Sequence, residues 1–161
     1  ANNKIYARSI DSKDHPSRHW LKNNFGYLTH ILNKDTRICG ENLFAQHSIF
    51  YDDLETYFYG FSVWNEKNFC LSWDNTLEWF ALLGIKSVPV LYDGIFDEEK
   101  IKELWKEDKW EKMEGYVIRL AEGFFYREFS QKVGKFVRPG HVQTTKHWMH
   151  GQKLEKNLLK I

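Results

Sequence analysis

The stretch Glu114-Gly115-Tyr116-Val117-Ile118-Arg119 places a carboxylate and a glycine directly before an alternating run rich in β-branched and aromatic residues. Runs of this composition are typical of β-strands. We expect further strands, most of them separated by polar turns, at residues 4–9, 37–44, 57–64, 68–71, 88–92 and 133–137. This many short strands predict a mostly antiparallel sheet.

Helix signals stand between these strands. Residues 72–84 begin with Ser72 and close on Gly84, which is the pattern of a capped amphipathic helix. Its expected apolar face carries Leu77, Phe80, Ala81 and Leu83. A second helix is expected from Asp97, because the acids at 97–99 suit the first turn of a helix, and a third over residues 16–24. The strands and helices together predict an α+β fold with mostly antiparallel sheets and flanking helices, in one domain over residues 1–161.

Composition excludes several classes of protein. The chain has 161 residues, of which 42% are apolar and 28% charged, so disordered and collagen-like chains are excluded. Two cysteines, Cys39 and Cys70, make no disulfide framework. Because no signal peptide is visible and no apolar run approaches the roughly 20 residues of a membrane helix, we expect a soluble, cytoplasmic protein without a membrane partner.

The charge is unevenly distributed along the chain. Lys and Arg number 23 against 22 Asp and Glu, a formal net charge of +1. Residues 112–161 alone carry ten basic and four acidic side chains, which is 10 − 4 = +6. A basic end of this kind indicates an anionic partner.

Three short motifs could carry chemistry. Glu41 follows Gly40 at the end of an expected strand, where a ligand can approach the backbone closely, although a lone glutamate is usually a solvated surface residue. Glu114 repeats this arrangement, and its alternative interpretation is a turn before a strand. Lys132, Lys135 and Arg138 accompany the strand at 133–137, where alternation sends Lys135 to the opposite face from the other two; a basic edge strand that resists aggregation is the alternative.

Taken together, two separated carboxylates followed by a basic strand are what a nucleoside triphosphate site requires. Carboxylates can hold a ribose or a divalent metal, and lysines neutralise phosphates. Here the sequence resembles a known family. Residues 40–44, 114–119 and 132–138 resemble nucleotidyltransferase motifs III, IV and V of the RNA ligases related to phage and RNA-editing ligases, residues 7–9 resemble motif Ia, and residues 59–64 resemble motif IIIa. Residues 41–53 and 138–151 also look like bacterial members of this family.

The resemblance implies a nucleotidyltransferase (adenylation) domain of the DNA and RNA ligase type. Enzymes of the family bind ATP and Mg²⁺, form a lysyl–AMP intermediate, and transfer AMP to the 5′-phosphate of an RNA end. They then join that activated end to a 3′-OH with release of AMP. ATP, Mg²⁺ and RNA ends are therefore the expected cofactors and partners.

The resemblance also implies roles by position. Glu41 would contact the ribose, Phe61 would stack on adenine, Arg8 would reach the phosphate or ribose side, and Glu114 would bind the catalytic metal. Lys132 and Lys135 would bind phosphates. The family pattern separates its two lysines by one residue, whereas this chain has Lys132-x-x-Lys135-x-x-Arg138, so the identity of the second cation that faces the nucleotide stays open.

The basic end supplies the expected contacts to RNA. Arg138 and Lys146 would bind RNA phosphates, and Trp148 could stack on an unpaired base. Three nearby histidines include a His-x-x-His spacing, namely His141, His147 and His150. No cysteine follows them and no acid follows before Glu155, so a structural role is the better interpretation.

The nucleophile is the main departure from the family pattern. Family members carry a lysine in a Lys-x-Asp/His-Gly motif upstream of the strand that corresponds to residues 4–9, and no such motif occurs in residues 1–161. An amine nucleophile must be held in line with the α-phosphate. We therefore expect a fragment of a longer ligase that does not adenylylate itself alone; the alternative is a non-catalytic nucleotide- or RNA-binding module on the same fold.

Overall fold

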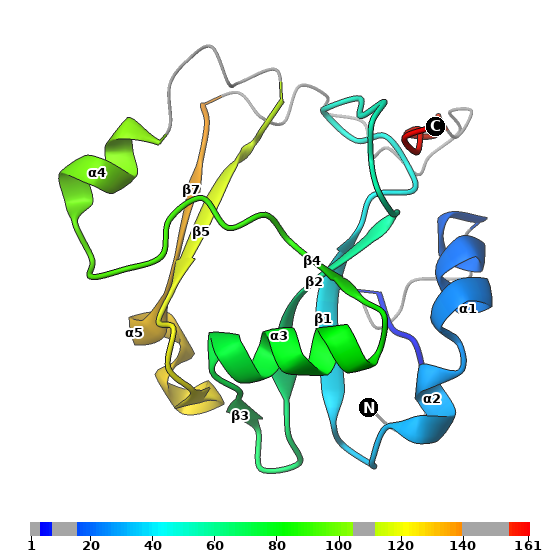
Figure 1. Cartoon of the computed structure of the whole chain (residues 1–161), viewed down its shortest axis with the longest axis horizontal. Helices are drawn as coiled ribbons and strands as arrows, with labels where there is room; N and C mark the ends of the chain where they lie inside the picture. Colours follow the sequence, from blue (N-terminus) through cyan, green and yellow to red (C-terminus); the bar gives the residue numbers. More distant parts are fainter. Residues whose placement is uncertain (1–3, 8–15, 105–111, 140–154) are drawn as a thin grey trace.

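The computed structural model describes residues 4–7, 16–104, 112–139 and 155–161 (Figure 1). Its larger sheet has the strand order β1-β2-β3-β6, with β4 paired to β2 as well. These strands are β1 (Arg37–Asn42), β2 (Phe58–Trp64), β3 (Phe69–Cys70), β4 (Lys86–Ser87) and β6 (Phe124–Phe125). Every pairing in this sheet is antiparallel except that of β2 with β4.

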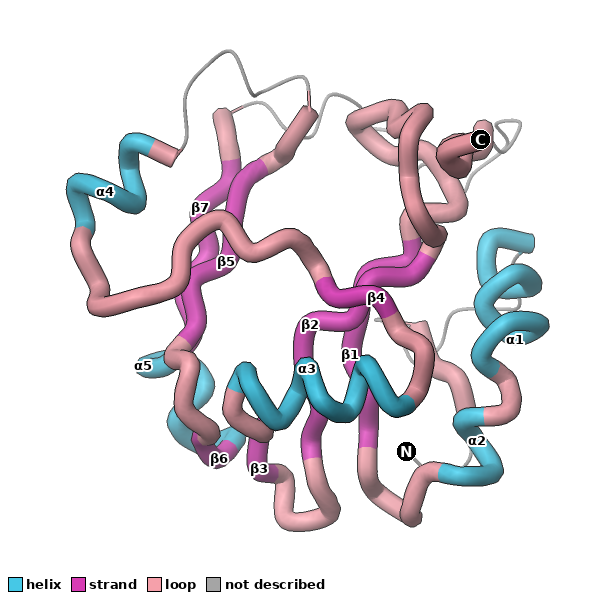
Figure 2. The backbone as a smooth tube through the Cα atoms, viewed as in Figure 1, coloured by secondary structure: helices cyan, strands magenta, loops and turns pink. Residues whose placement is uncertain are grey.

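A second, two-stranded sheet pairs β5 (Gly115–Arg119) with β7 (Val133–Val137) in antiparallel register. Figure 2 shows this strand pair beside the larger sheet, to which β6 joins it by pairing with β3. The pair is called the β5–β7 hairpin below, although residues 120–132 separate its two strands in the chain. The described residues thus form the α+β arrangement with antiparallel sheets that the sequence predicts. The strands expected at 37–44, 57–64, 68–71, 114–120 and 133–137 are all confirmed, within one or two residues at each end.

The pairing of β1 with β2 contains a β-bulge. Cys39 pairs with Ser62 and Gly40 pairs with Gly60, so Phe61 is an extra residue on β2. A bulge of this kind breaks the strict alternation of faces along a strand. Phe58 lies on one face of β2 and Val63 lies on the same face, because both belong to the core that contains Phe80.

Helix α3 (Trp73–Leu82) covers that face of the larger sheet (Figure 1). The Ser72 hydroxyl accepts a hydrogen bond from the Asn75 N–H, which confirms the expected N-cap. Phe80 is 1% exposed and its ring lies over Gly60, where an added Cβ would come within 2.4 Å of the ring. Thr76 is buried with it.

The expected apolar face of this helix is confirmed for Phe80 and Leu83 and wrong for Leu77 and Ala81. Leu77 and Ala81 are exposed, whereas Thr76 and Phe80 are buried and Leu83 is half-buried. The Phe80 ring packs against Gly60, and this contact sets the rotation of the helix about its axis.

The first helices complete the core from the other edge of the sheet. The short 3₁₀ turn Pro16–Arg18 leads into α1 (His19–Phe25), as expected for residues 16–24, and α2 (Leu28–Ile31) follows. Leu28 is buried against Phe58 and Phe80. This layer lies on the same side of the sheet as α3 and leaves the opposite face of β1 and β2 to other partners.

Two expected strands are wrong. Residues 88–92 form no strand, because the Val88 N–H bonds to the Gly60 carbonyl at 2.9 Å and Pro89 has no N–H with which to continue the ladder. The parallel pairing with β2 is instead made by Lys86 and Ser87. Residues 4–7 form no strand with the other described residues, and residues 8 and 9 lie outside the described part.

Three shorter helical segments remain among the described residues. Asp97 caps α4 (Glu98–Glu103) through the Lys100 N–H, as expected, and Ile101 is its buried residue. The 3₁₀ turn Tyr126–Glu128 and α5 (Phe129–Lys132) connect β6 to β7 and were not expected from the sequence. In the described part of the chain, no helix has the length and apolarity that a membrane span requires.

Candidate functional site

The face of β1 and β2 that α3 leaves uncovered carries the first predicted site residues. Glu41 pairs with Tyr59 across the two strands, so both side chains lie on one face. Gly60 faces Phe80 on the other side, which puts Tyr59 and Phe61 on the uncovered face. Phe61 is 40% exposed although Gly60 and Ser62 beside it are buried. A carboxylate and an aromatic ring therefore share this surface.

The β5–β7 hairpin presents a second surface. Val117 pairs with Lys135 and Arg119 pairs with Val133, so Val117, Arg119 and Lys135 lie on one face of the hairpin. The Arg119 guanidinium donates to the carbonyls of Phe61 at 3.3 Å and of Leu71 at 2.8 Å. This face of the hairpin is therefore directed toward β2, and Lys135 and the 61% exposed Val117 point the same way.

A glycine is required where the hairpin begins. The backbones of β5 and β7 approach so closely that a Cβ on Gly115 would lie 2.0 Å from the Phe136 carbonyl oxygen. The Arg138 N–H then donates to the Glu114 carbonyl at 2.9 Å, which extends the pairing by one residue beyond the strands. The glycine of the Glu-Gly motif thus allows the close pairing that holds Glu114 opposite Arg138.

Glu114 ties this end of the hairpin to the larger sheet. Its Oε1 accepts a hydrogen bond from the Ser48 hydroxyl, which belongs to the loop of residues 43–57 between β1 and β2. Arg119 makes the corresponding link at the other end of β5. The hairpin is thus fastened to the β1–β2 unit at both ends, and the site lies between these two contacts.

Both predicted carboxylates, Glu41 and Glu114, act electrostatically on the Tyr51 phenol. Burial raises the pKa of the Tyr51 phenol, and the neighbouring carboxylates of Glu114 and Glu41 raise it further while Arg138 acts in the opposite direction. The pKa of His47 is lowered by burial, against the attraction of Glu114. A single side chain, Tyr51, therefore lies within reach of Glu41, Glu114 and Arg138.

The structure separates the cations of the basic motif. Lys135 is exposed on the hairpin face directed toward β2. Lys132 is the last residue of α5 and directly precedes β7, which begins at Val133 as expected. Its carbonyl accepts a hydrogen bond from the Leu120 N–H at 3.0 Å, which extends the pairing of β5 with β7 by one residue.

Arg138 lies at the Glu114 end of the site. Its Nε is buried and has no hydrogen-bond partner in the described part of the protein. A buried guanidinium N–H without a partner is costly, so this group fits an anionic ligand. Arg8, Lys146 and Trp148, the other predicted contacts, lie outside the described residues.

Four side chains of this site were missed by sequence reasoning, namely His47, Ser48, Tyr51 and Val117. The first three stand in a loop that has no periodicity, and their only signal was the resemblance of residues 41–53 to bacterial ligases. Val117 was predicted only as a residue of a strand.

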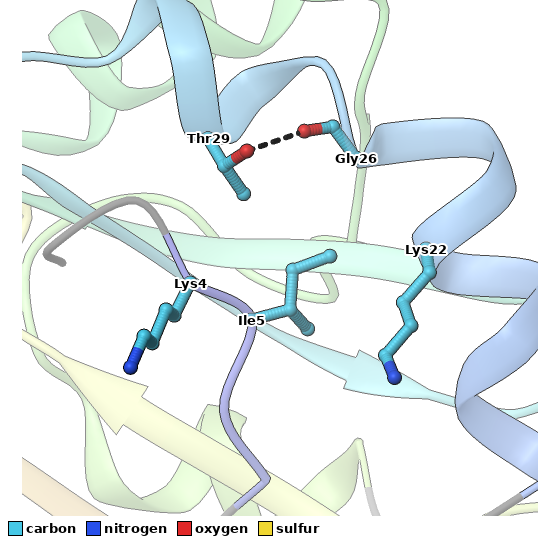
Figure 3. A pocket seen from close by; sticks show the side chains of 5 residues that line it. All are labelled: Lys4, Ile5, Lys22, Gly26 and Thr29. Carbon is cyan, nitrogen blue, oxygen red and sulfur yellow. Dashed lines mark hydrogen bonds between the residues drawn. The ribbon is translucent and has the colours of Figure 1, made fainter. Parts of the chain in front are cut away.

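Two hollows on the surface of the described residues lie apart from Glu41, Phe61, Glu114 and Lys135, none of which lines them. A cavity of about 480 Å³ adjoins Tyr59 and extends along β4 to Val90, with Glu55 and Lys86 paired at 2.8 Å on its wall. A separate hollow of about 310 Å³ is lined by Lys4, Ile5, Lys22, Gly26 and Thr29. Figure 3 shows the Lys4 side chain directed away from Lys22, so the two amines of this second hollow do not converge on one point.

The carboxylate available at this site suits a metal ion that is bound partly by substrate phosphates. No group of three or more His, Cys, Asp or Glu side chains that could hold a metal occurs in the described part of the chain. Mg²⁺ is commonly bound through one or two carboxylates together with substrate phosphates and water. Glu114, half-buried at the site with one oxygen bonded to Ser48, fits that role.

Comparison with known families was made over the whole chain. No curated protein and no solved structure matches it. The family model described as RNA ligase matches residues 2–137. That match spans all the motifs from Arg8 to Lys135 and well over half of the sequence, and the chain therefore belongs to the RNA ligase family.

Proposed function

We propose that this domain is the adenylation domain of an ATP-dependent RNA ligase. In the first step the Nζ of the lysine in a Lys-x-Asp/His-Gly motif attacks the α-phosphate of ATP, and pyrophosphate leaves. The 5′-phosphate of RNA then attacks the lysyl–AMP phosphorus and releases the lysine. Finally the 3′-OH of a second RNA end attacks the activated 5′-phosphate and AMP leaves.

The observation that supports this proposal most strongly is the placing of the motif residues on neighbouring surfaces. Glu41 and Phe61 lie on the uncovered face of β1 and β2, and Arg119 directs the hairpin face that carries Lys135 toward β2. Glu114 is bonded to Ser48 of the loop between β1 and β2. Acidic groups for a ribose and a metal, with a cation for phosphates on the facing surface, are the side chains that a nucleotide site needs.

The arrangement also suggests where each part of ATP binds. Phe61 and Val117 are large exposed apolar side chains on the two facing surfaces, and we place the adenine between them. Glu41, beside Phe61 on the same face, would accept hydrogen bonds from the ribose hydroxyls. Lys135 and Arg138 would neutralise the phosphates, and Glu114 would hold Mg²⁺, which supplies further neutralisation of phosphate charge.

The test is covalent labelling with AMP. The chain extended upstream to include a Lys-x-Asp/His-Gly motif should become labelled when incubated with α-³²P-ATP and Mg²⁺, and the label should move to 5′-phosphorylated RNA. Residues 1–161 alone should acquire no covalent label. Label on the shorter chain would show that another lysine serves and that the motif assignment is wrong. An extended chain that binds ATP without becoming labelled would support the non-catalytic binding module instead.

RNA binding should depend steeply on salt. The basic residues from 112 to 161 include side chains that serve ATP, so we expect two to four phosphate contacts to RNA. Each contact to a single strand contributes a slope of about −0.7 in log affinity against log salt, for a total of about −1.4 to −2.8. Lys146→Ala should make the slope shallower by about one contact and weaken binding to all RNA sequences to the same extent.

Filter binding between about 50 and 200 mM salt measures this slope. Lys67→Ala, in the exposed turn before β3, is the control and should leave the slope unchanged. Affinity that does not respond to salt would exclude RNA as the partner of the basic end and leave only the nucleotide site.

A further inference from the structure

Residues 155–161 pack along the loop of residues 43–57, here called the β1–β2 loop. Isolated bridges join the segment to the loop at two places, one antiparallel and one parallel: Ala45↔Lys156 and Leu54↔Leu159. The Gln46 N–H also donates to the Glu155 carbonyl at 2.9 Å, and the Lys160 N–H donates to the Leu54 carbonyl at 2.8 Å. The segment therefore holds both the first and the last part of the loop.

Asn157 lies at the centre of this contact and is 1% exposed. Its Oδ1 accepts the Tyr51 N–H at 2.9 Å, and its Nδ2 donates to the Leu43 carbonyl at 2.8 Å and to the Ala45 carbonyl at 3.4 Å. Its own carbonyl accepts the Tyr57 hydroxyl at 3.0 Å. Only an amide side chain supplies both an acceptor and two donors here, because aspartate has no donor when it is ionised.

The loop that Asn157 holds is the loop that touches Glu114. The Tyr51 backbone is bound on both sides, since its N–H goes to Asn157 and its carbonyl accepts the Leu158 N–H at 2.8 Å. Three residues earlier, the Ser48 hydroxyl donates to Glu114. Loss of the Asn157 bonds would therefore loosen the stretch from Ser48 to Tyr51, which carries the hydrogen bond to the Glu114 carboxylate.

We propose that Asn157 is a positioning residue of the ligase site. Asn157 holds the β1–β2 loop in place so that Ser48 orients the Glu114 carboxylate. Asn157 touches no substrate in this scheme and acts through the loop. The inference rests on the proposed function of Glu114. It also extends the site beyond residues 2–137, the part that the family model matches, because a residue outside that part sets the geometry within it.

The first arm of the test needs no ligand and no activity. Amide hydrogen exchange, followed by mass spectrometry on the full-length protein, should be faster in Asn157→Ala for peptides covering residues 43–57. Peptides covering α3 should be unchanged, because α3 packs on the other face of the sheet. Lys160→Ala, an exposed side chain in the same segment, is the control and should exchange like the wild type. Unchanged exchange in residues 43–57 would overturn the proposal.

The second arm measures the rate of lysine adenylylation as Mg²⁺ is varied. Because partners that orient a metal-binding side chain contribute about 10–100-fold to metal affinity or activity, Asn157→Ala should lower the rate by that factor and raise the half-saturating Mg²⁺ concentration. The loss should be smaller in a Ser48→Ala background, since both changes disturb one contact. Ile101→Ala, which removes a buried side chain of α4, should leave the Mg²⁺ dependence unchanged.

The outcomes separate this inference from the proposed function. A wild-type enzyme that forms no lysyl–AMP would refute the proposed function, while the hydrogen-exchange arm would still report on the loop. An active enzyme in which Asn157→Ala lowers the rate additively with Ser48→Ala and without a change in Mg²⁺ dependence would overturn the positioning role. If Asn157→Ala fails to fold, both measurements are made on Asn157→Ser, which keeps a side-chain oxygen.

Discussion

Glu114→Ala in the full-length enzyme should lower lysine adenylylation, strand sealing or both by about 100-fold or more, the order of magnitude of losing one preorganised charged contact at a reacting centre. Glu114 is half-buried; its carboxylate accepts a hydrogen bond from Ser48, and its backbone carbonyl accepts one from the Arg138 N–H. Its removal should leave the fold intact, because only the bond from Ser48 is lost, while the pairing of β5 with β7 and the Arg119 bonds to the larger sheet remain. Single-turnover rates measured with labelled ATP give the size of the effect.

Glu122→Ala is the matched control, because Glu122 is an exposed acid in the turn after β5 and should retain the wild-type rate. Glu128 is a poorer control, since its carboxylate accepts the Phe125 N–H and caps the turn before α5. Equal losses from Glu114→Ala and Glu122→Ala would mean that only the total negative charge matters, which would remove the assigned role of Glu114.

Lys135→Ala should cause a loss of about the same size, 100-fold or more in the rate of adenylylation. Lys135 pairs with Val117 on the hairpin face that Arg119 directs toward β2, and in the proposed site its amine would neutralise the phosphates of ATP. Lys132→Ala serves as the matched control, because Lys132 ends α5 and precedes the strand. We expect it to retain most of the activity.

The comparison of these two variants also answers a question left open by the sequence. If Lys132→Ala were as damaging as Lys135→Ala, the second cation of the motif would be Lys132. If Lys132→Ala is mild and Arg138→Ala is damaging, the second cation is Arg138, whose Nε is buried without a partner among the described residues. Binding of AMP by isothermal titration of the same variants would show whether the loss lies in binding or in catalysis.

The parts that could be predicted from sequence were those with a local cause. Alternation located β5 and β7, and Ser72 marked the beginning of α3 through its side-chain cap. Residues 88–92 look like a buried strand by composition, yet the lack of an N–H at Pro89 decided otherwise. The rotation of α3 depended on the space above Gly60, which no local pattern records.

The residues of the candidate site also differ in whether a local sequence pattern marks them. Glu41, Phe61, Glu114 and Lys135 could be named because they stand in motifs that resemble those of RNA ligases. Ser48, Tyr51 and Asn157 could not, because their roles arise from hydrogen bonds between distant segments. The bond from Ser48 to Glu114 spans 66 positions, and the bond from the Tyr51 N–H to Asn157 spans 106. Long-range polar contacts of this kind leave no periodic trace in a sequence.

The bulge in β2 has a consequence for how such a site can change over time. With Phe61 removed, Gly60 would be followed by Ser62, and side chains facing α3 and side chains facing away would alternate without interruption from Phe58 to Trp64. The strand and the core are thus complete without this ring. Insertion or deletion of a single codon could add or remove the ring while the core stayed the same, so ligand preference and folding can evolve independently at this position.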